Sequence, residues 1–435
     1  MTERASNPSE QSTIPAEADV VIIGAGIVGC STAYHLSHVG DSDVVVVDQG
    51  PLFETGGSTS HAPGLIGQAE HSELMSRLAQ YTVELFTGLD ADDTPCFAQT
   101  GSIDVAHSDA RWKYFQRYAE YSDSIGLDEA ALLAPGDIRD RFPLLNTDGV
   151  HGGYFVPTDG YTQSVNAAEA LGREAEVSGV RFHAHTTVTD IETTSGQVAA
   201  VATDTGRIET QQVLIATNIW APLLGDKLDV EIPLAPVEHQ YAVSDSLDDL
   251  TDRRGEHQLP VIRARDRLIY ARQHGDAIGI GSYHDEPTLI PPEEIADHNE
   301  VPTAPALREF SEHEFRPATE AMRDVLPAFE GVEINHGING LFALTPDGRP
   351  IIGEVDPVEG VWVAVGVWVT HAGGVGNILA EWMEHGTPKL DGETIDIHAL
   401  HIDRFDPAPD GQGIARERYA QQYNAIFGFS HPRIQ

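Results

Sequence analysis

Three glycines and one aspartate near the start of the chain have the spacing of a dinucleotide-binding motif. A β-branched apolar run leads into Gly24, Gly26 and Gly29 in the pattern G-x-G-x-x-G, and a second apolar run ends at Asp48. The first glycine permits a tight turn, the second lets backbone amides approach a pyrophosphate, and the third lets a helix pack closely on a strand. An acid about twenty residues farther on can accept a hydrogen bond from a ribose hydroxyl. The spacing predicts that the chain binds a dinucleotide.

A strand, a helix and a second parallel strand must hold these residues. Residues 20–23 and 44–47 are continuous apolar runs, typical of strands that are buried on both faces, and the pattern over 27–39 is helical. The pyrophosphate would lie at the N-terminus of this helix, where unpaired N–H groups and the helix dipole favour an anion. We therefore expect an α/β fold with a Rossmann-like domain.

The later sequence predicts a second domain of a different kind. Residues 234–283 form longer alternating strands with a hairpin around residues 274–276, which is typical of an antiparallel sheet. The segments 337–353 and 361–369, a glycine-rich turn and a helix over 377–385 indicate a return to the first domain. Other predicted helices span 109–126 and 161–178, and other short strands span 181–183, 187–191, 198–203 and 213–216.

Both domains are therefore expected to be discontinuous in sequence. The nucleotide-binding domain comprises 19–90, 150–228 and 335–390, and the antiparallel-sheet domain comprises 91–149 and 229–334. Residues 1–18 are polar and are expected to be a disordered lead, and 391–435 are expected to be a C-terminal extension or linker.

The charge of the chain excludes several classes of partner. The 435 residues include 68 acidic and 26 basic side chains, which gives a formal net charge of -42. This excess is spread along the whole chain, which suggests adaptation to high salt and argues against a nucleic-acid or anionic-membrane partner. Cys30 and Cys96 are the only cysteines, so neither a disulfide framework nor a metal site is predicted. Since no apolar run reaches the eighteen or so residues of a membrane span, we expect a soluble cytoplasmic protein.

The segment 56–65, GGSTSHAPGL, resembles the flavin loop of a known family of enzymes. It is similar to the dimethylglycine and sarcosine dehydrogenase and oxidase branch of the D-amino-acid-oxidase-like (DAO) FAD-dependent oxidoreductases. Further matches follow in order along the chain, namely VVDQGPL, YTVE, HQY, HGDAIGIGSY, TPDGRPIIGE and VWVTHAGGV. The resemblance implies a two-domain fold with FAD as the cofactor and an antiparallel sheet that covers the substrate.

The resemblance also assigns residues to the cofactor. In the family, the histidine of this loop forms a covalent bond to the methyl group on the benzene ring of the flavin, which points to His61. Imidazole is a neutral nucleophile at cellular pH, so this role is chemically reasonable. Ser58, Thr59 and Ser60 would donate hydrogen bonds to phosphate and ribose oxygens. The remaining implied contacts are Ile27, Val28, Asp48, Gln49, Leu65 and Val188 to the nucleotide, and Val367, Trp368, Val369 and Thr370 to the isoalloxazine, although core burial explains the valines equally well.

His239 and Tyr270 match the pair of substrate-site residues in the family. An alternative for Tyr270 is an ordinary half-buried aromatic of a strand. The functional interpretation rests on the requirement that hydride leaves the carbon beside an amine nitrogen only when the nitrogen lone pair is free. A desolvated pocket disfavours the charged amine, and a histidine that is hydrogen-bonded to a tyrosine could accept or relay the proton.

The expected function is oxidation of an N-methylated glycine, dimethylglycine or sarcosine, to an iminium ion. The one-carbon unit would then be released as formaldehyde or passed to folate. Because the sequence ends at residues 431–435 without a folate-binding half, we expect any folate transfer to need a separate tetrahydrofolate-binding protein. The electron acceptor could be oxygen, an electron-transfer flavoprotein or a quinone.

Three alternatives stay open. The chain could oxidise another small amino acid such as glycine or proline, or it could be a non-catalytic FAD-carrying subunit paired with a folate-binding protein. The presence of His61, His239 and Tyr270 argues against a non-catalytic subunit. A nicotinamide-dependent dehydrogenase fits the first fifty or so residues but does not explain the GGSTSH segment.

One residue departs from the family pattern. Asn218 stands where relatives usually have glycine in the turn after the strand 213–216. Asparagine tolerates the left-handed backbone conformation better than most residues, so we expect the turn to be retained with a small strain.

Overall fold

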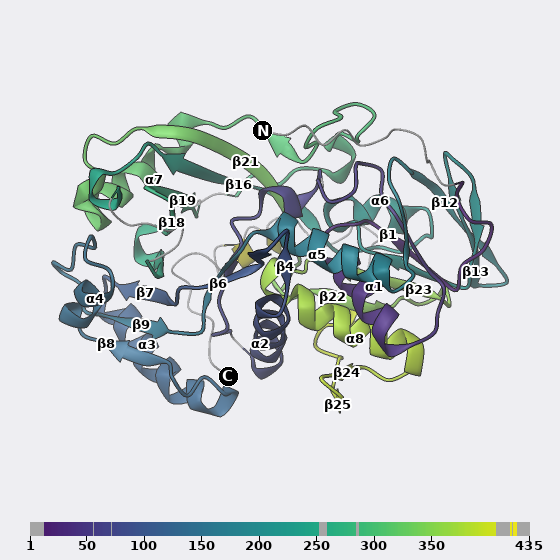
Figure 1. Cartoon of the computed structure of the whole chain (residues 1–435), viewed down its shortest axis with the longest axis horizontal. Helices are drawn as coiled ribbons and strands as arrows, with labels where there is room; N and C mark the ends of the chain where they lie inside the picture. The colour runs from purple at the N-terminus through teal and green to yellow at the C-terminus, as the bar shows by residue number, and fades with distance from the viewer. Residues whose placement is uncertain are drawn as a thin grey trace.

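Two large sheets of different kinds organise the molecule (Figure 1). The computed structural model describes residues 13–54, 56–70, 72–251, 259–283, 287–405, 418–419 and 421–423. Six strands form a mainly parallel sheet in the right half of Figure 1, and nine strands form a mainly antiparallel sheet in the left half. The expected combination of a Rossmann-like sheet and a second antiparallel sheet is confirmed.

The six-stranded sheet has the order β11-β2-β1-β15-β23-β22, and only β22 runs antiparallel to its neighbour. Its strands are β1 (Val20–Ile23), β2 (Val44–Val47), β11 (Arg181–His183), β15 (Gln212–Ile215), β22 (Ile351–Glu354) and β23 (Val361–Val365). All residues of β1 and β2 are buried, because both sheet faces are covered.

Helices cover one face of this sheet and a small second sheet covers the other. Val20 and Ile22 pack among the helices, whereas Val21 and Ile23 pack on the opposite side, as alternation along a strand requires. The helices are α1 (Ile27–Val39), α2 (Glu73–Thr87), α5 (Ser164–Val177) and α8 (Ala372–His385), and the small sheet consists of β12 (Val188–Thr194), β13 (Gln197–Thr203) and β14 (Arg207–Glu209).

The nine-stranded sheet forms the second part of the molecule, with the order β20-β21-β16-β19-β18-β17-β7-β9-β8. Its strands are β7 (Ser102–Ala106), β8 (Ala131–Leu133), β9 (Gly152–Val156), β16 (Ala235–Ser244), β17 (Val261–Ala264), β18 (Ile269–His274), β19 (Ala277–Ser282), β20 (Leu307–Arg308) and β21 (Ile334–Leu344). The predicted hairpin is present, because β18 and β19 pair antiparallel around Gly275.

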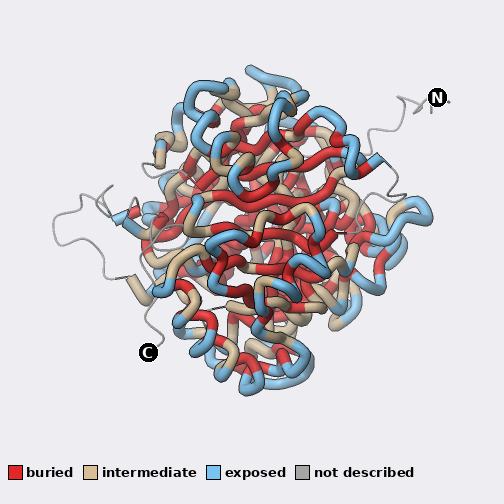
Figure 2. Tube along the Cα trace, turned by 90° about the vertical axis from the view of Figure 1, so that its left-hand side faces the viewer, coloured by how far each residue is buried: buried red, intermediate tan, exposed pale blue. Residues whose placement is uncertain are grey.

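Shorter elements complete the described chain. The helices α3 (Asp109–Ser122), α4 (Pro135–Arg141) and α7 (Glu312–Val325) pack on the larger sheet, and α6 (Ala221–Asp226) follows β15. The remaining strands are β3 (Leu65–Ile66), β6 (Phe97–Gln99) and β10 (Gly160–Thr162), which form one sheet, and the pairs β4 (Asp90–Ala91) with β5 (Thr94–Pro95) and β24 (Lys389–Leu390) with β25 (Glu393–Thr394). Buried segments run through the centre of the trace in Figure 2 and exposed segments lie mostly at its periphery.

The sheets differ from the expected segment boundaries at two strands. Residues 150–228 and 335–390 were assigned to the nucleotide-binding domain, but β9 and nearly all of β21 fall within these ranges and belong to the nine-stranded sheet. These two strands belong to the nine-stranded sheet because β9 pairs along its length with β7, and β21 pairs along its length with β16. The chain therefore crosses between the sheets within these segments.

Hydrogen bonds attach both terminal segments of the described chain to the sheets. Residues 13–18 belong to the segment expected to be a disordered lead, yet Ala18 N–H donates to the Glu209 carbonyl on β14 at 3.0 Å. Within the expected extension 391–435, His401 Nε2 donates to the Glu354 carbonyl at 2.8 Å. Residues 1–12 and the terminal residues 431–435 lie outside the described residues.

The glycine-rich segment before residue 377 is the first turn of α8 and not the expected turn. A Cβ on Gly374 would lie 2.7 Å from a side-chain atom of Leu78 on α2, and one on Gly376 would lie 2.3 Å from Ser31 Oγ on α1. These glycines therefore permit close helix packing, which outweighs their low helix propensity. Within the described ranges, no helix is long and apolar enough to cross a membrane.

The contact between α1 and the glycine turn gives a testable constraint. A Cβ on Gly29 would lie 1.9 Å from the carbonyl oxygen of Gly24, whereas a Cβ on Gly136 in α4 would meet no atom within 4 Å. We expect Gly29→Ala to lower the free energy of unfolding by about 3 kcal/mol through overpacking. The control Gly136→Ala should leave stability unchanged or raise it by about 0.5 kcal/mol. Denaturant unfolding of both variants measures this, and equal stabilities would contradict the close contact.

Candidate functional site

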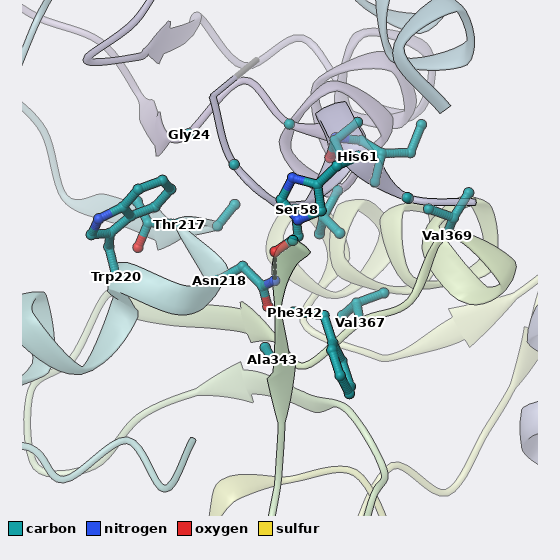
Figure 3. A pocket seen from close by; sticks show the side chains of 18 of the residues that line it. Gly24, Ser58, His61, Thr217, Asn218, Trp220, Phe342, Ala343, Val367 and Val369 are labelled. Carbon is teal, nitrogen blue, oxygen red and sulfur yellow. Dashed lines mark hydrogen bonds between the residues drawn. The ribbon is translucent and has the colours of Figure 1, made fainter. Parts of the chain in front are cut away.

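One continuous cavity of about 660 Å³ is lined by residues from both large sheets. Figure 3 shows part of its wall, with Gly24, Thr217 and Trp220 at the left, His61 in the middle, Val369 at the right and Phe342 below. The turns after β1, β2 and β15 form the first side, because the carboxyl ends of parallel strands meet at one edge of the sheet.

The glycine turn is closed by backbone and side-chain hydrogen bonds. Gly24 has φ +107°, a conformation that favours glycine, and its N–H donates to the Val47 carbonyl at 2.8 Å. The Asp48 carboxylate accepts the N–H of Ala25 at 2.7 Å and that of Gly50 at 2.8 Å. Asp48 therefore shapes the turn and still has lone pairs available for a ribose hydroxyl.

The flavin-loop motif forms a short 3-10 helix, Ser58–His61, which is attached to β21. The Ser58 hydroxyl and His61 Nε2 both donate to the carbonyl of Leu341 at 2.8 Å. Because a carbonyl only accepts, the proton of His61 is on Nε2 and the lone pair is on Nδ1. Burial lowers the pKa of His61 to about 4, so the imidazole is neutral at pH 7. A Cβ on Gly340 would lie 2.1 Å from the ring, so glycine is required beneath it.

The turn after β15 adds three polar groups. Asn218 has φ +47°, so the expected left-handed conformation is present. Its Oδ1 accepts the N–H of Gly366 at 3.0 Å, and its Nδ2 donates to Ser58 Oγ at 3.2 Å (Figure 3). Thr217 Oγ1 and Trp220 Nε1 are buried beside the cavity and have no hydrogen-bond partner within the described part of the chain. They are suited to bind a polar ligand.

His239 and Tyr270 come together on the nine-stranded sheet. His239 Nε2 and the Tyr270 hydroxyl are 2.9 Å apart, and the two ring planes are within 5° of each other. A Cβ on Gly281, which lies between the two strands on β19, would come within 1.8 Å of the Tyr270 ring. Burial raises the pKa of Tyr270 well above its usual value, so this phenol stays protonated at neutral pH.

Sequence reasoning missed the two arginines of this cavity. Arg263 pairs across the strands with Tyr270, so both side chains lie on the same face of the sheet. Arg263 Nε is buried without a hydrogen-bond partner among the described residues, whereas Arg265 lies 3.7 Å from the Asp104 carboxylate. The signal in the sequence was a pair of arginines two positions apart in the otherwise apolar segment VIRAR, since charges are rarely buried without a partner or a ligand. The aromatic residues Tyr241, Tyr283 and Phe342 also line the cavity and were not predicted.

The structure brings nearly all predicted site residues into this one cavity. Gly29 and Ser60 do not line it, because Gly29 packs against Gly24 and the Ser60 hydroxyl donates to the Gly57 carbonyl at 2.7 Å. The predicted residues that do line it are Gly24, Gly26, Ile27, Val28, Asp48, Gln49, Ser58, Thr59, His61, Leu65, Val188, His239, Tyr270, Val367, Trp368, Val369 and Thr370. Among the described residues, no cluster of histidine, cysteine or acidic side chains is arranged to hold a metal ion.

Residues 19–382 match the family described as DAO, FAD dependent oxidoreductase. The chain belongs to this DAO family. It is 28% identical over 430 residues to mitochondrial sarcosine dehydrogenase of Mus musculus, which covers 96% of this chain and 45% of that protein. It is 30% identical over 421 residues to mitochondrial dimethylglycine dehydrogenase of Homo sapiens, covering 95% of this chain and 47% of that protein. It is 31% identical over 427 residues to the mitochondrial regulatory subunit of pyruvate dehydrogenase phosphatase of Mus musculus, covering 97% of this chain and 47% of that protein.

This DAO-family chain therefore spans about half the length of the curated relatives that it matches. Among solved structures, it is similar to L-proline dehydrogenase from P. horikoshii, with a TM-score of 0.76 and 25% identity, covering 87% of this chain and 96% of that one. The matched family is one of FAD-dependent oxidoreductases, which agrees with the dinucleotide-binding turn of this chain.

The residues of the cavity fit FAD. The glycine turn opens at the N-terminus of α1, where a pyrophosphate binds, and Asp48 lies beside it for the ribose. Thr217 Oγ1 and Trp220 Nε1 have no hydrogen-bond partner among the described residues and are therefore available to the cofactor. The apolar wall near Val367 and Val369 suits a flat ring system.

Asn218 provides a test of how this site is held together. We expect Asn218→Ala to destabilise the protein by about 2 kcal/mol, because it removes two hydrogen bonds and retains the left-handed backbone. Asn218→Gly should cost only about 1 kcal/mol, because glycine adopts this conformation without strain. Thermal unfolding and FAD content of both variants check this. An alanine variant as stable as the glycine variant would contradict the assigned strain.

Proposed function

We propose that this protein oxidises an N-methylated glycine, dimethylglycine or sarcosine, with FAD bound in the described cavity. The proposal rests mainly on one observation, the hydrogen-bonded pair His239–Tyr270 beside Arg263 in the same cavity as the flavin loop. The similarity to sarcosine dehydrogenase and dimethylglycine dehydrogenase supports this substrate class.

The walls of the cavity match both ends of such a substrate. The guanidinium of Arg263 can bind a carboxylate with charge-assisted hydrogen bonds, and its unpaired buried Nε lacks another acceptor among the described residues. Tyr241, Tyr283, Phe342 and Trp368 surround the space with aromatic rings, which attract a methylated ammonium group through cation–π interactions. The substrate would thus be a zwitterion with a methylated amine and a carboxylate.

The pair His239–Tyr270 would then control the proton of the amine. Since burial disfavours a charged amine, a proton can pass to the neutral Tyr270 hydroxyl while the Tyr270 proton moves to His239 Nε2. Bound FAD would supply the two-electron acceptor for hydride from the N-methyl carbon. The resulting iminium ion would be hydrolysed to formaldehyde, or its one-carbon unit would pass to a separate tetrahydrofolate-binding protein. The terminal electron acceptor, whether oxygen, an electron-transfer flavoprotein or a quinone, would be a further partner.

His61 would anchor the flavin through a covalent bond to its ring methyl group. The imidazole is neutral, its Nδ1 carries the lone pair, and its ring is held in place by the Leu341 carbonyl and by Gly340. These features support a nucleophilic nitrogen at a defined place in the cavity wall.

Two other functions have specific support. Similarity to L-proline dehydrogenase supports oxidation of proline or another small amino acid such as glycine. Similarity to a phosphatase regulatory subunit supports a non-catalytic FAD-carrying subunit. The retained His239–Tyr270 hydrogen bond favours catalysis over the second of these.

Anaerobic flavin reduction distinguishes these functions. We expect dimethylglycine and sarcosine to bleach the flavin absorbance of the purified protein faster than proline or glycine do, because only the methylated amines match the aromatic walls. In His239→Ala the reduction should slow and its pH profile should shift. If only proline bleaches the flavin, the protein is a proline oxidoreductase and the proposed substrate is wrong. If none of the four amines bleaches the flavin, the result favours a non-catalytic subunit.

Denaturing intact-mass measurement tests the covalent anchor. The wild-type protein should be heavier than its polypeptide by one FAD, and His61→Ala should have the mass of the polypeptide alone while FAD binds non-covalently. His151→Ala is a matched control, since this histidine is exposed and does not line the cavity, and the variant should retain the added mass. A wild-type mass equal to that of the polypeptide would refute the anchor.

Substitution of Arg263 tests the carboxylate site. Arg263→Met should raise the KM for dimethylglycine about 100-fold, while trimethylamine or dimethylamine, which lack a carboxylate, should be oxidised at unchanged KM. Arg77→Met is a matched control, because Arg77 pairs with Glu393 outside the cavity. An equal change in KM for both kinds of amine would rule out a contact with the carboxylate.

A further inference from the structure

The described C-terminal residues pack against the wall of the substrate cavity. Residues 418, 419 and 421–423 are helical, and they lie within the region that the sequence suggested to be an extension. Tyr419 and Tyr423 are buried in one apolar cluster with Val237 on β16, Leu344 on β21 and Leu289. Tyr423 has no exposed surface, so this segment is part of the packed structure.

Tyr423 reaches His239 from the side opposite Tyr270. Its hydroxyl lies 3.5 Å from His239 Nδ1, and the Tyr270 hydroxyl lies 2.9 Å from His239 Nε2. The Tyr423 ring is 6.2 Å from that of Phe342, which itself meets the His239 ring edge-on at 5.7 Å. The imidazole thus has a phenol at each ring nitrogen, although these residues come from three distant parts of the chain.

We propose that Tyr423 is a positioning residue that holds His239 in the tautomer that can accept a proton from Tyr270. In this arrangement Nδ1–H donates to the Tyr423 oxygen, and the lone pair of His239 is on Nε2, facing the Tyr270 hydroxyl. The opposite tautomer would place a proton on Nε2 and leave His239 unable to accept another there. Hydrogen bonds of this kind are often long before substrate binds and shorten in the reacting complex.

The proton balance assigns each phenol one task. As an amine N–H bond breaks, its proton goes to the Tyr270 oxygen, and the original Tyr270 proton goes to His239 Nε2. The imidazole then carries protons on both nitrogens, and the Tyr423 oxygen accepts the hydrogen bond from Nδ1–H. Tyr423 does not itself line the cavity, so it acts through His239, which does. The proton transfer from the amine rests on the proposed function. The tautomer of His239 in the protein without substrate can be measured independently of that function.

The groups that face His239 make this tautomer measurable. Tyr270 on β18, Tyr283 after β19 and Tyr423 surround its ring, and Phe342 adds apolar surface. Burial raises the pKa of Tyr270 and of Tyr283, so both are neutral phenols at pH 7, and Arg263 is the nearby cation that acts on both. None of these neighbours competes as an anion for the proton on Nδ1.

The test compares Tyr423→Phe with Tyr419→Phe in the FAD-loaded full-length protein. Both remove one buried phenol hydroxyl from the same segment, but only Tyr423 contacts His239. Nitrogen-15 NMR of histidine-labelled protein reports the tautomer, with His239 assigned by the loss of its signals in His239→Gln. In wild type and in Tyr419→Phe we expect protonated Nδ1 and unprotonated Nε2. In Tyr423→Phe we expect a mixture of both tautomers.

Stopped-flow flavin reduction with dimethylglycine gives the second readout. Tyr423→Phe should reduce the maximal rate about five- to tenfold, the effect of one hydrogen bond on a transition state. The acidic limb of the pH profile of flavin reduction should shift to lower pH in this variant. The reason is that protonated His239 loses a hydrogen-bond acceptor and therefore forms less readily. Fluorotyrosine at position 423 keeps the packing and weakens the acceptor, so it should give an intermediate shift.

The outcomes separate this inference from the proposed function. An unchanged tautomer of His239 in Tyr423→Phe overturns the role of Tyr423, whatever the activity. If no amine bleaches the wild-type flavin, the proposed function fails, and the NMR comparison still decides whether Tyr423 sets the tautomer. Equal shifts of the pH profile in Tyr419→Phe and Tyr423→Phe would show general loosening of the segment and also overturn the assignment.

Discussion

The carbonyl of Leu341 joins the two parts of the molecule. It accepts hydrogen bonds from the Ser58 hydroxyl and from His61 Nε2, which both belong to the loop that follows β2. Leu341 itself lies in β21, which pairs along its length with β16. A glycine next to it, Gly340, permits the imidazole to lie against the strand. Two donors on one acceptor therefore fix the loop, the histidine tautomer and the distance between the parallel and the antiparallel sheet.

This junction explains why the chemical groups converge. β16 carries His239 on the strand that pairs with β21, and β19 connects it to β18 and therefore to Tyr270. β17 then adds Arg263 on the same face. Each of these strands is paired with the next by backbone hydrogen bonds. The loop proposed to hold the flavin and the sheet that carries the proposed substrate residues are therefore fixed relative to each other. Groups on rigid strands are suited to catalysis because their geometry varies little.

The sequence predicted the elements with strong local signals. The buried strands β1, β2 and β15, the hairpin β18–β19 and the dinucleotide turn follow from apolar runs and glycine spacing. His61, His239 and Tyr270 came from family resemblance, because a single histidine or tyrosine has no periodicity of its own. The helical start of α8 was missed because glycine has a low helix propensity, and the contacts that compensate for it lie on α1 and α2, far away in the sequence. Tyr423 was missed for a similar reason, since its partner lies 184 residues away.

The wall of the cavity begins at Ile23 and is completed only by Thr370. A ribosome that has synthesised the glycine turn has therefore made less than a tenth of the polypeptide and almost none of the pocket. Among the described residues the lining is complete only once Thr370 has been made, so a product that terminates before this residue would lack part of the flavin site even where its first crossover is correctly formed. Bound pigment is thus a readout of synthesis at least to this residue and of correct folding.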